Sequence, residues 1–194
     1  MDIINKYLKY SRFGSGVINN SISFIIIGIS GVIINFFILL KYNVEILGVF
    51  NQSLAVYVIL SQISNFGLYY SVLNYTSDLT NNKSQKIESI FSALIIGILI
   101  PIPIIVLVYY NINNIIFFFK SDYVGQAVGI SSYALIFFSA NKILIAGLNG
   151  LGNLTSVAIF NSIRPILAVL FLLVIILSGL HEYYLFFMFL FSES

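Results

Sequence analysis

The apolar residues of the chain form long runs that are separated by short polar segments. No charged residue occurs within residues 13–40, 46–77, 89–119, 123–141, 143–163 or 165–180. A bilayer core requires about 20 predominantly apolar residues per helix, and most of these runs reach that length. The pattern predicts helices at residues 17–40, 47–70, 90–110, 124–148 and 154–178, and a sixth helix that starts near residue 183.

Helices explain these runs better than strands do. Lipid offers no hydrogen-bond partner to an unpaired backbone group, and the alternating segments of transmembrane barrels are only about ten residues long. Of the 194 residues, 59% are hydrophobic and only 8% are charged, whereas about a quarter of the residues of a soluble domain are charged. We therefore expect an all-α, multi-spanning membrane helical bundle of about six transmembrane helices. It forms a single domain over residues 1–194 with the lipid bilayer as its solvent.

The basic residues predict the orientation of the bundle, because Lys and Arg concentrate in cytoplasmic segments. With a cytoplasmic N-terminus, the outside segments contain only Lys41 and Lys120. The inside segments then contain more basic residues: Lys6, Lys9, Arg12, Lys83 and Lys86. The sequence therefore predicts that the N-terminus is cytoplasmic.

The second predicted helix contains three amides on one face. At about 100° per residue, Asn51, Gln62 and Asn65 point in similar directions. Lipid penalises exposed amides, so this face is expected to contact other helices or water. Two interpretations remain open: the amides form hydrogen bonds between helices, each worth ~0.6 kcal/mol, or they line a polar cavity for a substrate.

Two cations lie within apolar surroundings. Lys142 is near the end of the fourth predicted helix, and Arg164 is early in the fifth, one turn after Asn161. A cation at bilayer depth costs on the order of 2.5–3.5 kcal/mol, unless the side chain reaches the membrane surface. No acidic residue lies within a predicted span. The expected partner is an anionic ligand or a carboxylate from a missing half of the protein.

Catalytic chemistry has little support in the sequence. The chain has no cysteine and a single histidine, and it has no carboxylate pair at helical spacing for acid–base or metal chemistry. The net charge of +2, without a basic run, gives no support for a nucleic-acid partner. We predict no catalytic residue, no metal and no cofactor, and we do not expect an enzyme.

Two segments resemble a known family. They are EILGVFNQSLAVYVILSQISNFGLYYSVLNYTS at residues 45–77, and NKILIAGLNGLGN at 141–153 followed by VAIFNSIR at 157–164. Both are similar to bacterial polysaccharide flippases of the multidrug/oligosaccharidyl-lipid/polysaccharide exporter superfamily. The resemblance implies two helical bundles around a central cavity in the bacterial cytoplasmic (inner) membrane. By alternating access, such a protein flips undecaprenyl-diphosphate-linked oligosaccharides for O-antigen or capsule synthesis, without an ATPase of its own.

The resemblance also implies roles and partners. The cavity candidates are Asn51, Gln62, Asn65, Lys142, Asn161 and Arg164, with the cations holding an anionic lipid-linked oligosaccharide. Other polysaccharide-assembly membrane proteins are further expected partners. The chain departs from the family pattern in supplying about one bundle, and its last apolar run is too short to span a bilayer. We therefore expect the N-terminal half of a longer flippase with an incomplete last helix.

Other functions stay open. Drug exporters and peptidoglycan-lipid flippases of the same superfamily usually carry a carboxylate or more cations within the first bundle. A membrane enzyme of polysaccharide assembly should show a large periplasmic loop or an intramembrane catalytic His or Asp. A non-functional truncated remnant is the last alternative.

Overall fold

The computed structural model describes residues 2–78, 80 and 82–194; for residues 2–13 and 15 it describes the backbone alone. The side chains of Lys6, Lys9 and Arg12, on which the predicted orientation partly depends, lie outside the described residues. Within the described part, the chain is helical and contains no strand. The elements are α1 (Asp2–Lys41), α2 (Val44–Asn65), α3 (Leu68–Ser77), α4 (Lys83–Leu99), α5 (Pro101–Tyr110), α6 (Ile112–Phe119), α7 (Asp122–Ser132), α8 (Ala134–Gly150), α9 (Leu154–Leu177), the 3-10 helix η1 (Glu182–Phe186) and α10 (Phe187–Glu193).

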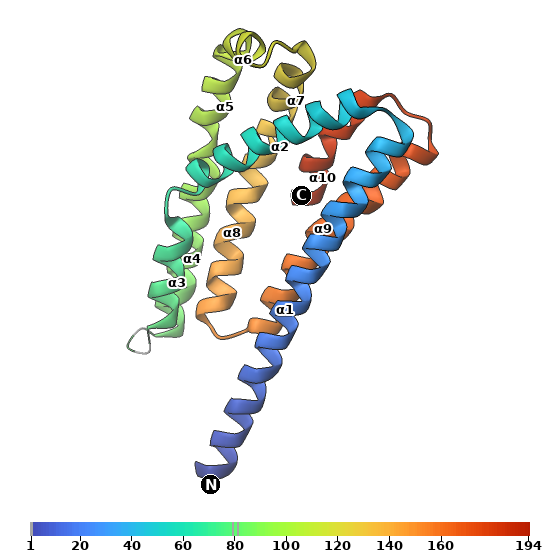
Figure 1. Cartoon of the computed structure of the whole chain (residues 1–194). Coiled ribbons are helices and arrows are strands. Elements are labelled where there is room, and N and C mark those ends of the chain that lie inside the picture. Colours follow the sequence, from blue (N-terminus) through green and yellow to red (C-terminus); the bar gives the residue numbers. More distant parts are fainter. Residues whose placement is uncertain (1, 79, 81) are drawn as a thin grey trace.

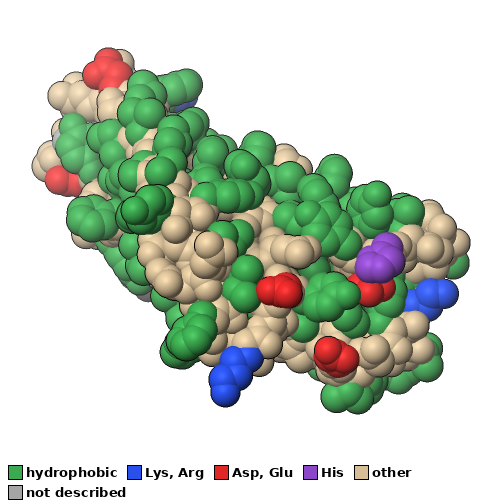
Figure 2. Space-filling model, turned by 90° about the horizontal axis from the view of Figure 1, so that it is seen from above, with side chains coloured by type: hydrophobic (Ala, Val, Ile, Leu, Met, Phe, Trp, Pro, Cys, Tyr) green, Lys and Arg blue, Asp and Glu red, His purple; other side chains and the backbone are tan. Residues whose placement is uncertain are grey.

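The all-helical class is confirmed for the described residues, and several helices are consistent with membrane spans, although the number six is not confirmed. In the described residues, 4 helices are long and apolar enough to cross a bilayer: Gly16–Lys41, Val44–Asn65, Lys83–Tyr110 and Leu154–Leu177. Helices α7 and α8 add a fifth span if this pair, bent by 44°, counts as one. The space-filling view in Figure 2 shows one end of the molecule, with a few charged side chains among hydrophobic ones. The apolar last run, predicted as the start of a sixth helix, forms the short elements η1 and α10.

The helices form two arms joined by α2 (Figure 1). One arm consists of α1 and α9, which run side by side in the same direction. The other contains α3, α4, α5 and α8, with α8 packed against α3 and α4. Helix α2 crosses from the first arm to the second, and α10 turns back into the space between them. The largest apolar core joins the arms through fully buried side chains such as Ile38, Leu135 and Leu172.

Hydroxyl groups link α1 to α9. Ser23 Oγ donates to the Ala158 carbonyl oxygen at 2.7 Å, and Ser162 Oγ donates to Ser23 Oγ at 2.9 Å. Beyond the end of α1, the Tyr42 hydroxyl donates to the Leu180 carbonyl oxygen at 3.1 Å. Burial, together with the nearby Glu182 carboxylate, raises the pKa of Tyr42. These bonds hold α1 and α9 in one fixed register.

The prediction of one straight helix over residues 47–70 is wrong at one point. Phe66 has φ 44° and Gly67 has φ 77°, so both adopt the left-handed conformation that ends a helix. Helix α2 therefore stops at Asn65, and α3 starts in a new direction at Leu68. By contrast, Pro101 begins α5 directly after α4, where its missing backbone donor is tolerated, and the span Lys83–Tyr110 continues through it.

Candidate functional site

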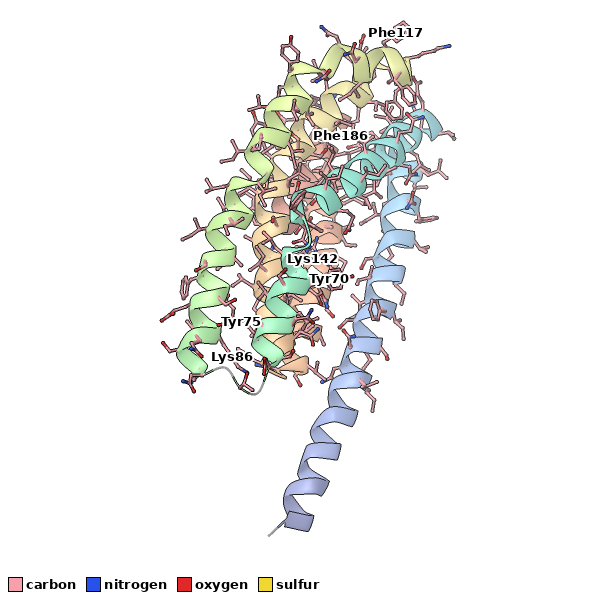
Figure 3. The ribbon with its side chains drawn as sticks, turned by 90° about the vertical axis from the view of Figure 1, so that its left-hand side faces the viewer. Tyr70, Tyr75, Lys86, Phe117, Lys142 and Phe186 are labelled. Carbon is pink, nitrogen blue, oxygen red and sulfur yellow. The ribbon has the colours of Figure 1, made fainter. Side chains whose placement is uncertain are left out.

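A cavity of about 560 Å³ lies between the two arms. Residues of α1, α2, α3, α8, α9 and α10 line it. Its wall combines apolar side chains with hydroxyl and amide groups and three charged residues, Lys142, Arg164 and Glu193. Figure 3 shows Lys142 away from both ends of the helix bundle. The site is thus a cavity of mixed polar and apolar lining among helices that are long and apolar enough to cross a membrane.

The Arg164 guanidinium forms an ion pair with the carboxylate of Glu193. The Glu193 side chain is only 2% exposed, whereas that of Arg164 is 25% exposed. Two further groups donate to the same carboxylate: the Tyr57 hydroxyl at 3.1 Å from Oε1, and the Asn141 side-chain amide at 3.5 Å from Oε2. The amide of Asn141 also donates to the backbone carbonyl oxygen of Glu193. Four helices therefore meet at one carboxylate.

The expectation that no acidic residue of this chain neutralises Arg164 is wrong. Glu193 follows the last apolar run and lies outside every predicted span. The structure brings it to mid-bundle because η1 and α10 reverse the chain after α9. Burying this carboxylate is tolerable only because a cation and two hydrogen-bond donors surround it.

Of the two cations that line the cavity, Lys142 is the one without a counterion among the described residues. Its Nζ lies 5.5 Å from the centroid of the Phe138 ring, and the Arg164 Cζ lies 5.3 Å from the same centroid. A ring face attracts cations at this range. In the described part of the chain, Lys142 forms no ion pair. Because two cations and one carboxylate line the cavity, it carries one net positive charge.

The Arg164 donors are only partly used. Its Nε atom is buried and has no hydrogen-bond partner among the described residues. A guanidinium has five N–H donors in a planar fork that matches two oxygens of a carboxylate or phosphate. Glu193 therefore leaves part of this fork free for another acceptor.

Of the six predicted cavity residues, the structure brings four together: Gln62, Lys142, Asn161 and Arg164 line the cavity. The remaining two do not. Asn51 is exposed and its amide donates to Asn35 Oδ1 at 3.0 Å. Asn65 is buried at the end of α2, and its Oδ1 has no partner in the described part of the chain.

Helix α2 divides the predicted amides between the two interpretations: Asn51 forms a hydrogen bond to Asn35 of α1, whereas Gln62 lines the cavity. Its buried positions include Val49, Ser53, Tyr57 and Ser64, which follow a different face from Asn51 and Gln62. Because helix α2 ends before Gly67, the periodicity also cannot be extended to the next helix. Gln62 lines the cavity and remains exposed.

Sequence reasoning missed Glu193, Tyr57, Asn141 and Phe138. Only Glu193 carried a signal in the sequence, since it is an acidic residue directly after ten uncharged positions, 183–192. Comparison of the chain with protein-family models, with curated proteins and with solved structures gives no match.

Proposed function

We propose that this protein is a helical bundle of a bacterial flippase, which moves lipid-linked anionic oligosaccharides across the cytoplasmic membrane. The observation that carries the proposal is the cavity with a net positive charge inside membrane-spanning helices. The sequence resemblance at residues 45–77 and 141–164 supports the same assignment. In this proposal the N-terminus is cytoplasmic, and a second bundle completes the transport path.

The cavity has the chemistry that such a substrate needs. Amides from Gln62, Asn161 and Asn149 offer donors and acceptors to sugar hydroxyls. Lys142 offers an unpaired positive charge to a phosphate or an acidic sugar. The amides contribute specificity and the cation contributes affinity.

The arrangement of the arms also suits alternating access. Transporters of this kind rock rigid helical units around a site near the bilayer midplane. Here the arms are joined by α2, and the break at Phe66 and Gly67 separates α2 from α3. We propose that the arms move relative to one another around the cavity, with the α2–α3 junction absorbing the change.

One observation favours a second candidate, a cation-coupled exporter of the same superfamily. Glu193 is a carboxylate within the bundle, as such exporters usually have. However, its charge is neutralised by Arg164, and Tyr57 and Asn141 occupy its oxygens. An anionic substrate therefore fits the cavity better than a cationic one.

The test replaces the unpaired cation. A strain that lacks the gene is complemented with the wild-type protein or with Lys142→Gln, and surface polysaccharide is measured at equal protein level in the membrane. We expect a decrease of about tenfold, which corresponds to roughly 1.4 kcal/mol of lost substrate binding. Lys83→Gln, at the exposed start of α4, is the matched control and should leave the polysaccharide unchanged. Normal polysaccharide with Lys142→Gln would contradict the proposal.

A further inference from the structure

The Arg164–Glu193 pair lies on the wall of two cavities. The first is the polar cavity between the arms. The second, of about 430 Å³, shares Arg164, Glu193 and Ser192 with it. The side chains that line the second cavity are otherwise largely apolar: Ile90, Leu144, Leu148, Leu151, Phe160 and Ile163. The guanidinium therefore stands at the junction of a polar and an apolar compartment.

A ligand that fills both cavities must have a polar part and an apolar part, and the two must join near Arg164. Its polar part would contact the amides of the first cavity, and its apolar chain would pack against the leucine and isoleucine side chains of the second. The group between them would face Arg164, whose free Nε donor and fork geometry suit an oxyanion. Lys142 lies near the same Phe138 ring as Arg164 and adds a second positive charge.

Glu193 supplies only part of the negative charge that this junction can accept. Its carboxylate neutralises one of the two cations and leaves a buried donor of Arg164 unsatisfied. Glu193 belongs to α10, the helix that turns back into the space between the arms. Phe189, one turn earlier, is stacked on Phe50 and Tyr57 and anchors the rest of the helix.

We propose that Arg164 and Lys142 bind the oxyanion that joins the apolar chain to the polar head of an amphiphile, and that Glu193 is an internal occupant which this oxyanion displaces. The inference rests on the proposed function. It adds where the lipid chain lies and which group pairs with Arg164 when no substrate is bound. An acidic sugar has the same oxyanion chemistry but no apolar chain, so it would not use the second cavity.

Binding to the purified full chain in detergent micelles tests the inference. The probes are farnesyl diphosphate, inorganic pyrophosphate and methyl glucuronide, with empty micelles as the blank. Glu193→Gln removes the internal competitor and should tighten binding of both diphosphates by between about 5-fold and 150-fold, the usual range of coupling between sites. The gain in affinity should vanish in the Glu193→Gln/Arg164→Gln double variant.

A further variant tests the apolar cavity. Leu144→Gln, at an exposed position of this cavity, should weaken the binding of farnesyl diphosphate by about tenfold and leave the binding of pyrophosphate unchanged.

Three results would overturn the inference. They are an unchanged affinity of Glu193→Gln for the diphosphates, a gain that persists without Arg164, and tighter binding of methyl glucuronide than of farnesyl diphosphate. If any of these occurs while Lys142→Gln still lowers surface polysaccharide, the proposed function stands and only the displacement of Glu193 is refuted.

A second measurement does not depend on the folding of Glu193→Gln. The chain contains no cysteine, so Ser194→Cys accepts a single bimane label next to Glu193 in an otherwise unchanged protein. Farnesyl diphosphate should change the emission of the label, because Ser194 lines the apolar cavity that the lipid chain would fill. An unchanged emission at saturating probe would also overturn the inference.

Discussion

The two partners of the Arg164–Glu193 ion pair should contribute unequally to stability, with Arg164→Gln more destabilising than Glu193→Gln. Removing one partner of a buried pair costs roughly 3–5 kcal/mol when the other charge is left stranded. Arg164→Gln strands a carboxylate that is 2% exposed, so the cost should be near the lower bound, about 3 kcal/mol, because Tyr57 and Asn141 still donate to it.

Glu193→Gln should cost less. It strands a guanidinium that is 25% exposed in a polar cavity, next to the Phe138 ring. The glutamine oxygen can still accept the hydrogen bond from Tyr57. We expect a loss of about 1–2 kcal/mol for this change. The double variant strands no charge and should cost little more than Glu193→Gln, so the coupling energy should be close to the cost of Arg164→Gln, about 3 kcal/mol.

Unfolding in detergent micelles measures these energies. The chain contains no tryptophan, so helix loss is followed by circular dichroism at 222 nm instead of by tryptophan fluorescence. The matched control is the pair His181–Glu182, whose closest atoms are 3.4 Å apart and whose histidine side chain is 64% exposed. Its coupling should stay below about 1 kcal/mol. A coupling for Arg164 and Glu193 as small as the control would refute the buried pair, and equal losses for the two single variants would refute the asymmetry.

Two glycines test the packing and the backbone. Gly150→Ala would place a methyl group against Thr76 and 2.9 Å from the Leu73 carbonyl oxygen, so overpacking should destabilise the protein by about 1–3 kcal/mol. Gly67→Ala has open space but φ +77°, so thermal unfolding should show a loss of about 1–2 kcal/mol. Gly28→Ala, a helix position with no atom nearby, is the control for both and should be neutral or stabilising; a loss there as large as in the other two variants would contradict both arguments.

The helices could be predicted from the sequence because hydrophobic length follows directly from bilayer thickness. The break after α2 could not, because Phe66 and Gly67 lie in an uncharged run and hydropathy does not report backbone conformation. For the same reason the pattern gives no sign of the 44° bend between α7 and α8. Hydropathy thus predicts which segments are apolar enough to cross a membrane, whereas the local backbone conformation determines where a helix ends or bends.

The candidate site could be predicted only in part. Lys142 and Arg164 stand out because charge is rare in apolar segments, and both line the cavity. Glu193 was missed because its position depends on the reversal of the chain at η1, which brings residues far apart in sequence together. The free cation is consequently Lys142 instead of Arg164, and the cavity has less net charge than two unpaired cations would give it.

The ion pair also constrains how the arms can move. Glu193 on α10 is bound by Arg164 on α9, by Tyr57 on α2 and by Asn141 on α8, so its carboxylate connects the arm containing α9 with the arm containing α8. Separating the arms must break at least one of these contacts, and each broken contact would strand a buried polar group. An oxyanion that replaces Glu193 at Arg164 supplies the missing negative charge while releasing the Glu193 carboxylate from α9. Binding of the ligand and loosening of the arms would then be the same event, which gives substrate control of the motion without any separate switch.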